Sequence, residues 1–232
     1  MTTPDVERVK SISNESLRFF GAMSASVSHE IRNKLAVINE KAGLVEDIAV
    51  AMRSGRAPDP DRLETQARKI IEQIRQANSM VRALNRLAHS TDESDTTVDV
   101  TDMVALAVEL YGRAAAMAQT VIDHAGPESE ITVRSNPFLL VNAVGRCLGL
   151  AMERVDDSRI LTVVTEPLAG GALVRMRRLA GIADNGTEIM RDHPGLAALL
   201  DVLGAEVTVD HARGELVLEI TESKSHDHGG QP

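Results

Sequence analysis

The chain has 232 residues, with 25 lysines and arginines against 34 aspartates and glutamates, so its formal net charge is −9. This acidic charge and an aromatic share of only 2% exclude an ordinary nucleic-acid-binding protein, which needs a basic surface and stacking side chains. The apolar share of 43% is too high for a disordered chain. The sequence contains no apolar run long enough to span a membrane and no signal peptide. We therefore expect a cytoplasmic protein that binds neither nucleic acid nor membranes.

The charges divide the chain into two parts. Residues 1–95 carry 14 basic and 14 acidic side chains, whereas residues 96–232 carry 11 basic and 20 acidic side chains. The hydrophobic periodicity changes at the same place. The sequence therefore predicts a helical domain over residues 1–93, a second domain over residues 96–222 and a polar tail over residues 223–232.

The first part has the pattern of two long helices. Apolar residues recur every three or four positions between Ile12 and Met52, as on one helix face. The segment 54–60, SGRAPDP, interrupts this pattern with one glycine and two prolines. A second seam then follows a heptad spacing through Leu63, Ala67, Ile70, Ile74, Ala77, Val81, Leu84 and Ala88.

Two helices joined by a short loop form an antiparallel hairpin, which buries too little apolar surface to be stable alone. Two copies would complete a four-helix bundle, so we expect a homodimer. The alternative is a monomer in which the hairpin packs on the second domain.

His29 lies off the apolar seam of the first helix. At about 100° per residue, it points away from Val27 and Ile31. The residues that share its face are small or polar: Ala22, Ala25, Ser26, Arg32, Asn33 and Ala36. Such a face would let the surface of another protein approach the imidazole, although a surface histidine beside alanines also arises by chance.

The segment 26–38, SVSHEIRNKLAVI, resembles the H-box of sensor histidine kinases, whose usual pattern is S-H-E-[IL]-R-[NT]-P-L. The match covers Ser28, His29, Glu30, Ile31, Arg32, Asn33 and Leu35. This resemblance implies that His29 carries a phosphoryl group. The chain departs from the pattern at Lys34, where the family usually has a proline. Because proline kinks a helix, we expect a straighter helix here.

The residue types in this motif suit phosphoryl transfer. A neutral imidazole nitrogen is a good nucleophile near neutral pH. Glu30 could orient the ring or take a proton, and Arg32 could pair with phosphate oxygens. Asn33 lies beside His29 on the helix surface, and the resemblance assigns phosphatase activity to its amide. The spacing is not that of a zinc peptidase, because Asn33 replaces the second histidine of HExxH.

The second part alternates strands and helices. We predict strands at 96–100, 121–126, 130–135, 160–167, 172–179 and 205–220, the last forming a hairpin, and helices at 101–119, 136–155 and 195–204. This order resembles the catalytic domain of histidine kinases. The predicted fold class is therefore α+β: a helical hairpin forming a dimeric four-helix bundle, followed by an α/β sandwich resembling the kinase ATPase domain.

The residues that bind ATP in that family do not match this sequence. Leu150 takes the position of the magnesium-binding asparagine, and Arg146 takes that of an earlier asparagine. The adenine-binding D-x-G-x-G pattern is missing from RRLAGIADNG, and Asp184, Asn185 and Gly186 do not restore it. A segment without glycine, TEIMRDHP, replaces the glycine-rich lid. Leucine cannot coordinate a hard cation. We therefore expect no cofactor in this chain, with Mg²⁺ bound by the partner instead.

This combination resembles dimeric bacterial histidine phosphotransferases. It implies transfer of a phosphoryl group between the aspartates of response-regulator receiver domains through phospho-His29, with a hybrid histidine kinase as a further partner. Three alternatives stay open: a response-regulator phosphatase that uses Glu30 and Asn33, a non-catalytic scaffold or inhibitor that binds a kinase, and an active kinase. Two other clusters are weaker candidates for a site. Receiver docking or a remnant of the nucleotide site could use Arg175, Arg177 and Arg178, although a solvated strand end explains them better. A metal could bind the tail residues His226, Asp227 and His228, although a disordered terminus explains them better.

Overall fold

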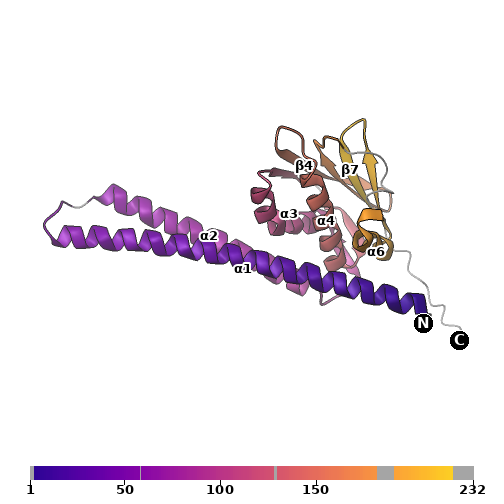
Figure 1. Cartoon of the computed structure of the whole chain (residues 1–232), viewed down its shortest axis with the longest axis horizontal. Helices are drawn as coiled ribbons and strands as arrows, with labels where there is room; N and C mark the ends of the chain where they lie inside the picture. Colours follow the sequence, from indigo (N-terminus) through magenta and orange to yellow (C-terminus); the bar gives the residue numbers. More distant parts are fainter. Residues whose placement is uncertain (1–2, 58, 128–129, 182–190, 222–232) are drawn as a thin grey trace. The chain divides into compact units, whose positions relative to one another are not determined.

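The computed structural model describes residues 3–57, 59–127, 130–181 and 191–221. Their contacts divide into two compact units: Gly21–Asn85, and the described residues of Met1–Phe20 and Arg86–Pro232. The long helix α1 (Thr3–Arg53) contributes to both units (Figure 1). The contacts thus group residues 3–20 with the second part of the chain, whereas the charge and periodicity of the sequence predict that they belong to the helical domain. In the part of the chain described, no helix is long and apolar enough to cross a membrane.

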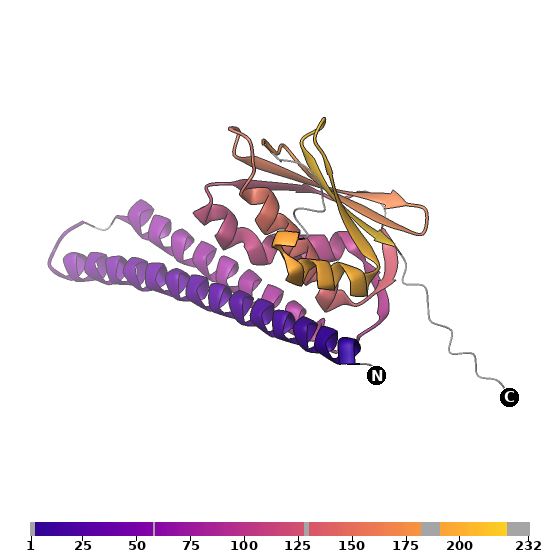
Figure 2. The same cartoon turned by 45° about the vertical axis from the view of Figure 1, so that its right-hand side comes forward.

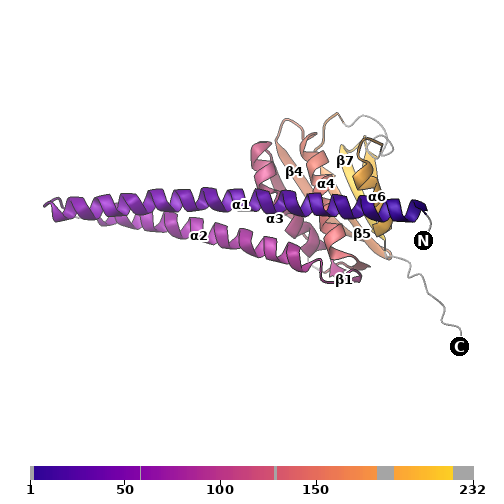
Figure 3. The same cartoon turned by 60° about the horizontal axis from the view of Figure 1, so that its bottom comes forward.

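The unit Gly21–Asn85 is a helical hairpin, formed by α1 and α2 (Pro60–His89), which lie side by side in Figures 1 and 3. The helices are separated by the predicted loop, and α2 begins at a proline. The Asp59 carboxylate accepts a hydrogen bond from the backbone N–H of Arg62 at 3.0 Å, which satisfies one free donor of the first turn. Helix α1 passes Lys34 without a break, as expected without the proline.

The predicted apolar seam is only partly covered in one copy of the chain. Two residues of the α2 seam, Ile74 and Val81, are 44% and 43% exposed, and Ile71, beside the seam, is 49% exposed, whereas the buried Ala83 lies one position away from the seam residue Leu84. On α1, Leu35 is also exposed. A helix with apolar residues on more than one stripe needs more than one packing partner. The hairpin therefore presents an apolar surface that its own two helices do not cover.

The second unit contains seven strands and three helices among its described residues, in addition to the ends of α1 and α2. In chain order they are β1 (Thr96–Asp99), α3 (Val100–Met117), β2 (Val121–Ala125), β3 (Thr132–Ser135), α4 (Pro137–Met152), β4 (Ile160–Leu168), β5 (Gly171–Arg177), α6 (Pro194–Leu203), β6 (Ala205–Asp210) and β7 (Glu215–Thr221). Strands β1 and β3 form a small antiparallel sheet. The others form a five-stranded sheet of order β2-β4-β5-β7-β6, in which only the pair β2–β4 is parallel.

Helices α3, α4 and α6 cover one face of the five-stranded sheet (Figure 2). Strands β4 and β5 alternate strictly in burial over most of their length, as expected for a sheet with one covered face. Their inward residues, including Leu161, Val163, Val174 and Met176, are fully buried. Helix α4 has thirteen buried residues along its length, so it forms the centre of this core.

Local signals in the sequence set the ends of the helices, although α3 begins at Val100, inside the stretch predicted as a strand. The Asp99 carboxylate accepts from the backbone N–H of Thr101 at 2.9 Å at the start of α3. At the start of α4, the Asn136 side chain accepts from the N–H of Leu139 at 2.9 Å, and Pro137 follows it. Helix α6 ends at Gly204, whose φ of 63° is the left-handed conformation that favours glycine.

Helices α3 and α4 approach closely at a tyrosine and a glycine. A Cβ atom added at Gly145 would lie 2.5 Å from the Tyr111 ring, so only glycine leaves room for the ring. The neighbouring Cys147 is fully buried. Burial raises the pKa of its thiol to about 12. Because the thiolate is the reactive form, Cys147 has a packing role.

Candidate functional site

The predicted phosphoryl acceptor, His29, lies on α1 within the hairpin unit, and its side chain is half-buried. Helix geometry places its six predicted neighbours within roughly 60° of it around the helix axis. Ser26 is half-buried, and the other five are exposed: Ala22, Ala25, Arg32, Asn33 and Ala36. Among the described residues, Arg32 has no carboxylate partner. The face around His29 therefore consists mostly of small, exposed side chains, with the basic Arg32 at one edge.

Glu30 is held by two neighbours on the same helix. The Lys34 ammonium lies 3.2 Å from one carboxylate oxygen, and the Asn33 amide donates to the other oxygen at 3.4 Å. The side chains of Lys34 and Glu30 are only 21% and 22% exposed. No hydrogen bond joins Glu30 to the His29 ring in the structure. The predicted pairing of Glu30 with the imidazole is thus not present, and Glu30 faces Lys34 and Asn33 instead.

The positions on α4 that should bind a nucleotide in a kinase have other contacts. Leu150 is buried. The Arg146 guanidinium donates to the Asn142 side chain at 3.0 Å and pairs with the Glu15 carboxylate of α1. A small cavity of about 160 Å³ beside these residues is lined by Arg146, Gly149, Leu150, Glu153, His193 and Leu196. The Arg146 guanidinium therefore already forms an ion pair with a carboxylate of its own chain.

The N-terminal turns of α1 contact the second unit at two further points. The rings of Phe19 and Phe138 meet edge to face, with centroids 5.8 Å apart, and both are buried. A Cβ atom added at Gly195 of α6 would lie 2.9 Å from the Glu15 carboxylate carbon. Phe19 lies within the apolar pattern of residues 12–52, which predicts a place on the seam of the hairpin. In the structure it packs on α4, a long-range contact that no local pattern signals.

We expect the Glu15–Arg146 pair to stabilise the second unit measurably. Its side chains are 21% and 26% exposed, so the pair is less screened than a surface pair. A double-mutant cycle of Glu15→Gln and Arg146→Met, measured by urea unfolding, should give a coupling energy of about 1 kcal/mol. Arg18 provides the matched control, because it pairs with the same carboxylate at 3.2 Å but is 78% exposed. The Glu15–Arg18 coupling should stay below about 0.5 kcal/mol; equal couplings would contradict the expectation.

Two of the three arginines of the predicted basic cluster, Arg175 and Arg177 on β5, are paired with two carboxylates. Arg175 contacts Glu166 at 2.7 Å and Glu215 at 3.2 Å, and Arg177 contacts the same two residues at 3.0 and 2.9 Å. The Arg175 guanidinium beside Glu166 holds the pKa of that carboxyl below its usual range. Two arginines that are paired in this way do not form a free anion-binding patch.

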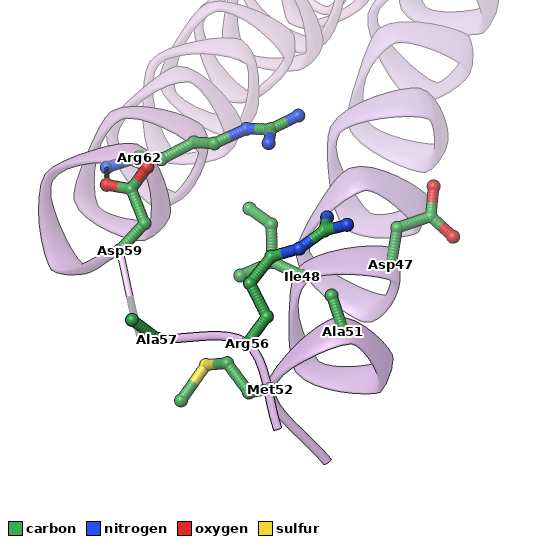
Figure 4. Close-up of a pocket in the computed structure, with 8 residues that line it drawn as sticks. All are labelled: Asp47, Ile48, Ala51, Met52, Arg56, Ala57, Asp59 and Arg62. Atoms are coloured by element: carbon green, nitrogen blue, oxygen red, sulfur yellow. Dashed lines mark hydrogen bonds between the residues drawn. The ribbon is translucent and has the colours of Figure 1, made fainter. Parts of the chain in front are cut away.

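A second cavity lies at the tip of the hairpin, where α1 turns into α2. It measures about 240 Å³ and is lined by Asp47, Ile48, Ala51, Met52, Arg56, Ala57, Asp59 and Arg62 (Figure 4). None of these is a predicted site residue. Since Asp47 is eighteen positions beyond His29 on one helix, the two lie roughly 27 Å apart along its axis, and the cavity is a separate feature.

Some predicted features lie outside the described residues. These are Asp184, Asn185 and Gly186, the first half of the segment that replaces the lid, and the tail residues His226, Asp227 and His228. In the described part of the chain, no group of three or more histidine, cysteine, aspartate or glutamate residues could hold a metal ion.

A scan against known protein families found no match, and a search of curated proteins found no relative. Solved structures do match. A bacterial phosphotransferase shares 14% identity and a TM-score of 0.50, covering 86% of this chain and 94% of its own. The histidine kinase AdeS of Acinetobacter baumannii has 12% identity, a TM-score of 0.47 and coverages of 84% and 98%. The ATP-binding domain of PrrB from Mycobacterium tuberculosis has 14% identity, a TM-score of 0.45 and coverages of 57% and 100%.

The likeness to the phosphotransferase extends over most of both chains and concerns the fold. It agrees with the order of elements in this chain, a helical hairpin followed by an α/β unit with a mixed sheet. The predicted α+β fold class, a helical hairpin followed by an α/β sandwich, is confirmed. Pairing of two hairpins into a bundle stays a prediction.

Proposed function

We propose that this chain is a histidine phosphotransferase of a two-component phosphorelay, which passes a phosphoryl group between receiver-domain aspartates through phospho-His29. The observation that carries the proposal is the setting of His29 on α1. The imidazole is half-buried on a face whose neighbours are small and mostly exposed. Such a face admits a second protein surface to within bonding distance of the ring.

In the proposed reaction, an imidazole nitrogen of His29 attacks the phosphorus of a receiver aspartyl-phosphate. The new P–N bond forms as the P–O bond to the aspartate breaks, and the electron pair leaves with the carboxylate. The carboxylate of a second receiver then attacks phospho-His29 in the reverse sense. Catalysis would come mainly from positioning and charge neutralisation, with the exposed guanidinium of Arg32 available to phosphate oxygens.

The features of α4 support a phosphoryl source other than ATP. Leu150 has no oxygen for a magnesium ion, and Arg146 is paired with Glu15. We therefore propose that the chain needs no cofactor of its own and that each receiver brings its own Mg²⁺. The partners are response-regulator receivers, with a hybrid histidine kinase as a further source of phosphoryl groups. Such partners would place the reaction in the cytoplasm.

We also propose a homodimer, in which the uncovered apolar residues of two hairpins face one another in a four-helix bundle. Ile71, Ile74 and Val81 lie within roughly 80° of one another around the axis of α2 and are exposed in a single chain. Light scattering should give twice the chain mass of 25.0 kDa, and the double substitution I71K/I74K should give the single mass. The control R68K/R75K changes exposed positions on the same helix and should keep the dimer. A monomeric wild-type chain would contradict the proposal.

The function is tested with receiver domains that have been labelled with radioactive acetyl phosphate and freed of the small donor. A relay protein should take up label that is stable in alkali and labile in acid, and should pass it to a second receiver. ATP labelled at the γ-phosphate serves as the kinase control and should give no label. A chain that accepts label from ATP, or from no receiver in the organism's set, overturns the proposal.

One observation favours a phosphatase as the second candidate. Asn33 is exposed beside His29, and Glu30 lies next to His29 on the same helix. Once the hydrogen bond between the Asn33 amide and Glu30 opens, the amide could orient a water that attacks a receiver aspartyl-phosphate. In that case receiver phosphate would be lost as inorganic phosphate without labelling the chain.

A further inference from the structure

Lys34 lies beside the proposed site, but it is neither a predicted docking residue nor the phosphoryl acceptor. Helix geometry places Asn33 at roughly 40°, Glu30 at roughly 100° and Lys34 at roughly 140° around the axis from His29. Glu30 therefore stands between an amide on the His29 side and an ammonium on the far side. Its carboxylate touches both, at 3.4 and 3.2 Å.

Each carboxylate oxygen of Glu30 makes one of the two contacts. Lys34 holds one oxygen away from His29, and the other oxygen takes up an amide hydrogen of Asn33. Hydrolysis of a receiver aspartyl-phosphate at this place would need these groups in other roles. The Asn33 amide would have to orient a water, and the Glu30 carboxylate would have to accept a proton from it.

We propose that Lys34 is a positioning residue that suppresses hydrolysis by holding Glu30 and Asn33 together, so that the phosphoryl group passes to a protein acceptor rather than to water. This inference rests on the proposed function, which it deepens. In the suppressed reaction, a water oxygen attacks the aspartyl-phosphate, the P–O bond to the aspartate breaks, and inorganic phosphate leaves. The water proton goes to the Glu30 carboxylate, and the aspartate carboxylate keeps the electron pair of the broken bond.

The test compares two rates in Lys34→Met: release of inorganic phosphate from a phosphorylated receiver, and transfer of label to a second receiver. We expect the ratio of hydrolysis to transfer to rise by about two- to fivefold, the range set by an ion pair of this exposure. Lys34→Arg restores a cation and should return the ratio to the wild-type value. Lys41→Met is the matched control, because Lys41 lies on the same helix, is 19% exposed and pairs with Glu40; its ratio should not change.

A second comparison separates positioning from a change in helix stability. If Lys34 acts through Glu30, Lys34→Met should have no further effect on the ratio in a Glu30→Gln background, while thermal unfolding of the two lysine variants stays alike. The inference is overturned if Lys34→Met leaves the ratio unchanged, or if it acts equally in the Glu30→Gln background. The proposed function is overturned by a different result, the absence of label on His29 in the wild-type chain. In that case the rate of phosphate release can still be compared between the variants.

Discussion

Replacing His29 with glutamine should abolish labelling of the chain by phosphorylated receivers and reduce receiver-to-receiver transfer to background. Glutamine keeps a polar side chain of similar size on a helix, but its amide nitrogen is not a nucleophile toward phosphorus. The expected effect is a complete loss rather than a slower rate, because no other described residue on this face offers a nucleophilic nitrogen. The measurement is the amount of acid-labile label on the chain at a fixed time.

Two companion variants show which activity the face supports. His89→Gln changes an exposed histidine on α2, whose ring lies 3.0 Å from Asp92, and should leave labelling unchanged. Asn33→Ala distinguishes the alternatives: a relay should retain acid-labile label, whereas a phosphatase should lose most of its activity. A scaffold would tolerate both His29→Gln and Asn33→Ala. Full transfer in the His29→Gln variant would eliminate the proposed mechanism.

Replacing Gly171 with alanine should destabilise the second unit by about 1–3 kcal/mol, the usual cost of overpacking. Gly171 begins β5 and pairs with Thr221 of β7. A Cβ atom at this position would lie 2.1 Å from the backbone oxygen of Ile220. Backbone in the middle of a sheet cannot move aside as a flexible side chain can, so the β5–β7 pairing would have to shift.

The matched control is Gly112→Ala in the middle of α3, where an added Cβ would meet nothing within 4 Å. Alanine is a better helix former than glycine, so this variant should gain roughly 0.5–1 kcal/mol. Thermal unfolding followed by circular dichroism measures both, with about 2–4 °C expected for each kcal/mol. A Gly171→Ala midpoint equal to that of wild type would contradict the close approach of β5 and β7.

Much of the second unit could be predicted from local patterns, because those patterns have local causes. The alternation of burial in β4 and β5 follows from one covered sheet face, and Gly170, with φ of 72°, supplies the tight turn between them. The helix ends at Asn136 and Gly204 were readable because each depends on a side chain or conformation within a few residues, whereas the cap of α3 is Asp99, which the pattern predicted as part of a strand.

Contacts between distant segments could not be predicted in this way. The heptad pattern identified apolar faces on α2 but could not say which partner covers Ile74 and Val81. Phe19 fits the seam as well as its neighbours do, and only the fold shows that it meets Phe138. Glu15 and Arg146 are 131 positions apart, and neither has a motif around it. At the site, the Glu30–Lys34 spacing of four was a usable signal for an ion pair.

The grouping of residues 3–20 with the second unit has a practical consequence for dissecting the protein. That unit is discontinuous in sequence, since Glu15 and Phe19 lie on α1 while their partners Arg146 and Phe138 lie on α4. A single cut near residue 95 would leave a C-terminal fragment with an uncovered aromatic ring and an unpaired guanidinium. A fragment faithful to the intact unit would instead need the first turns of α1 joined back to it by a linker.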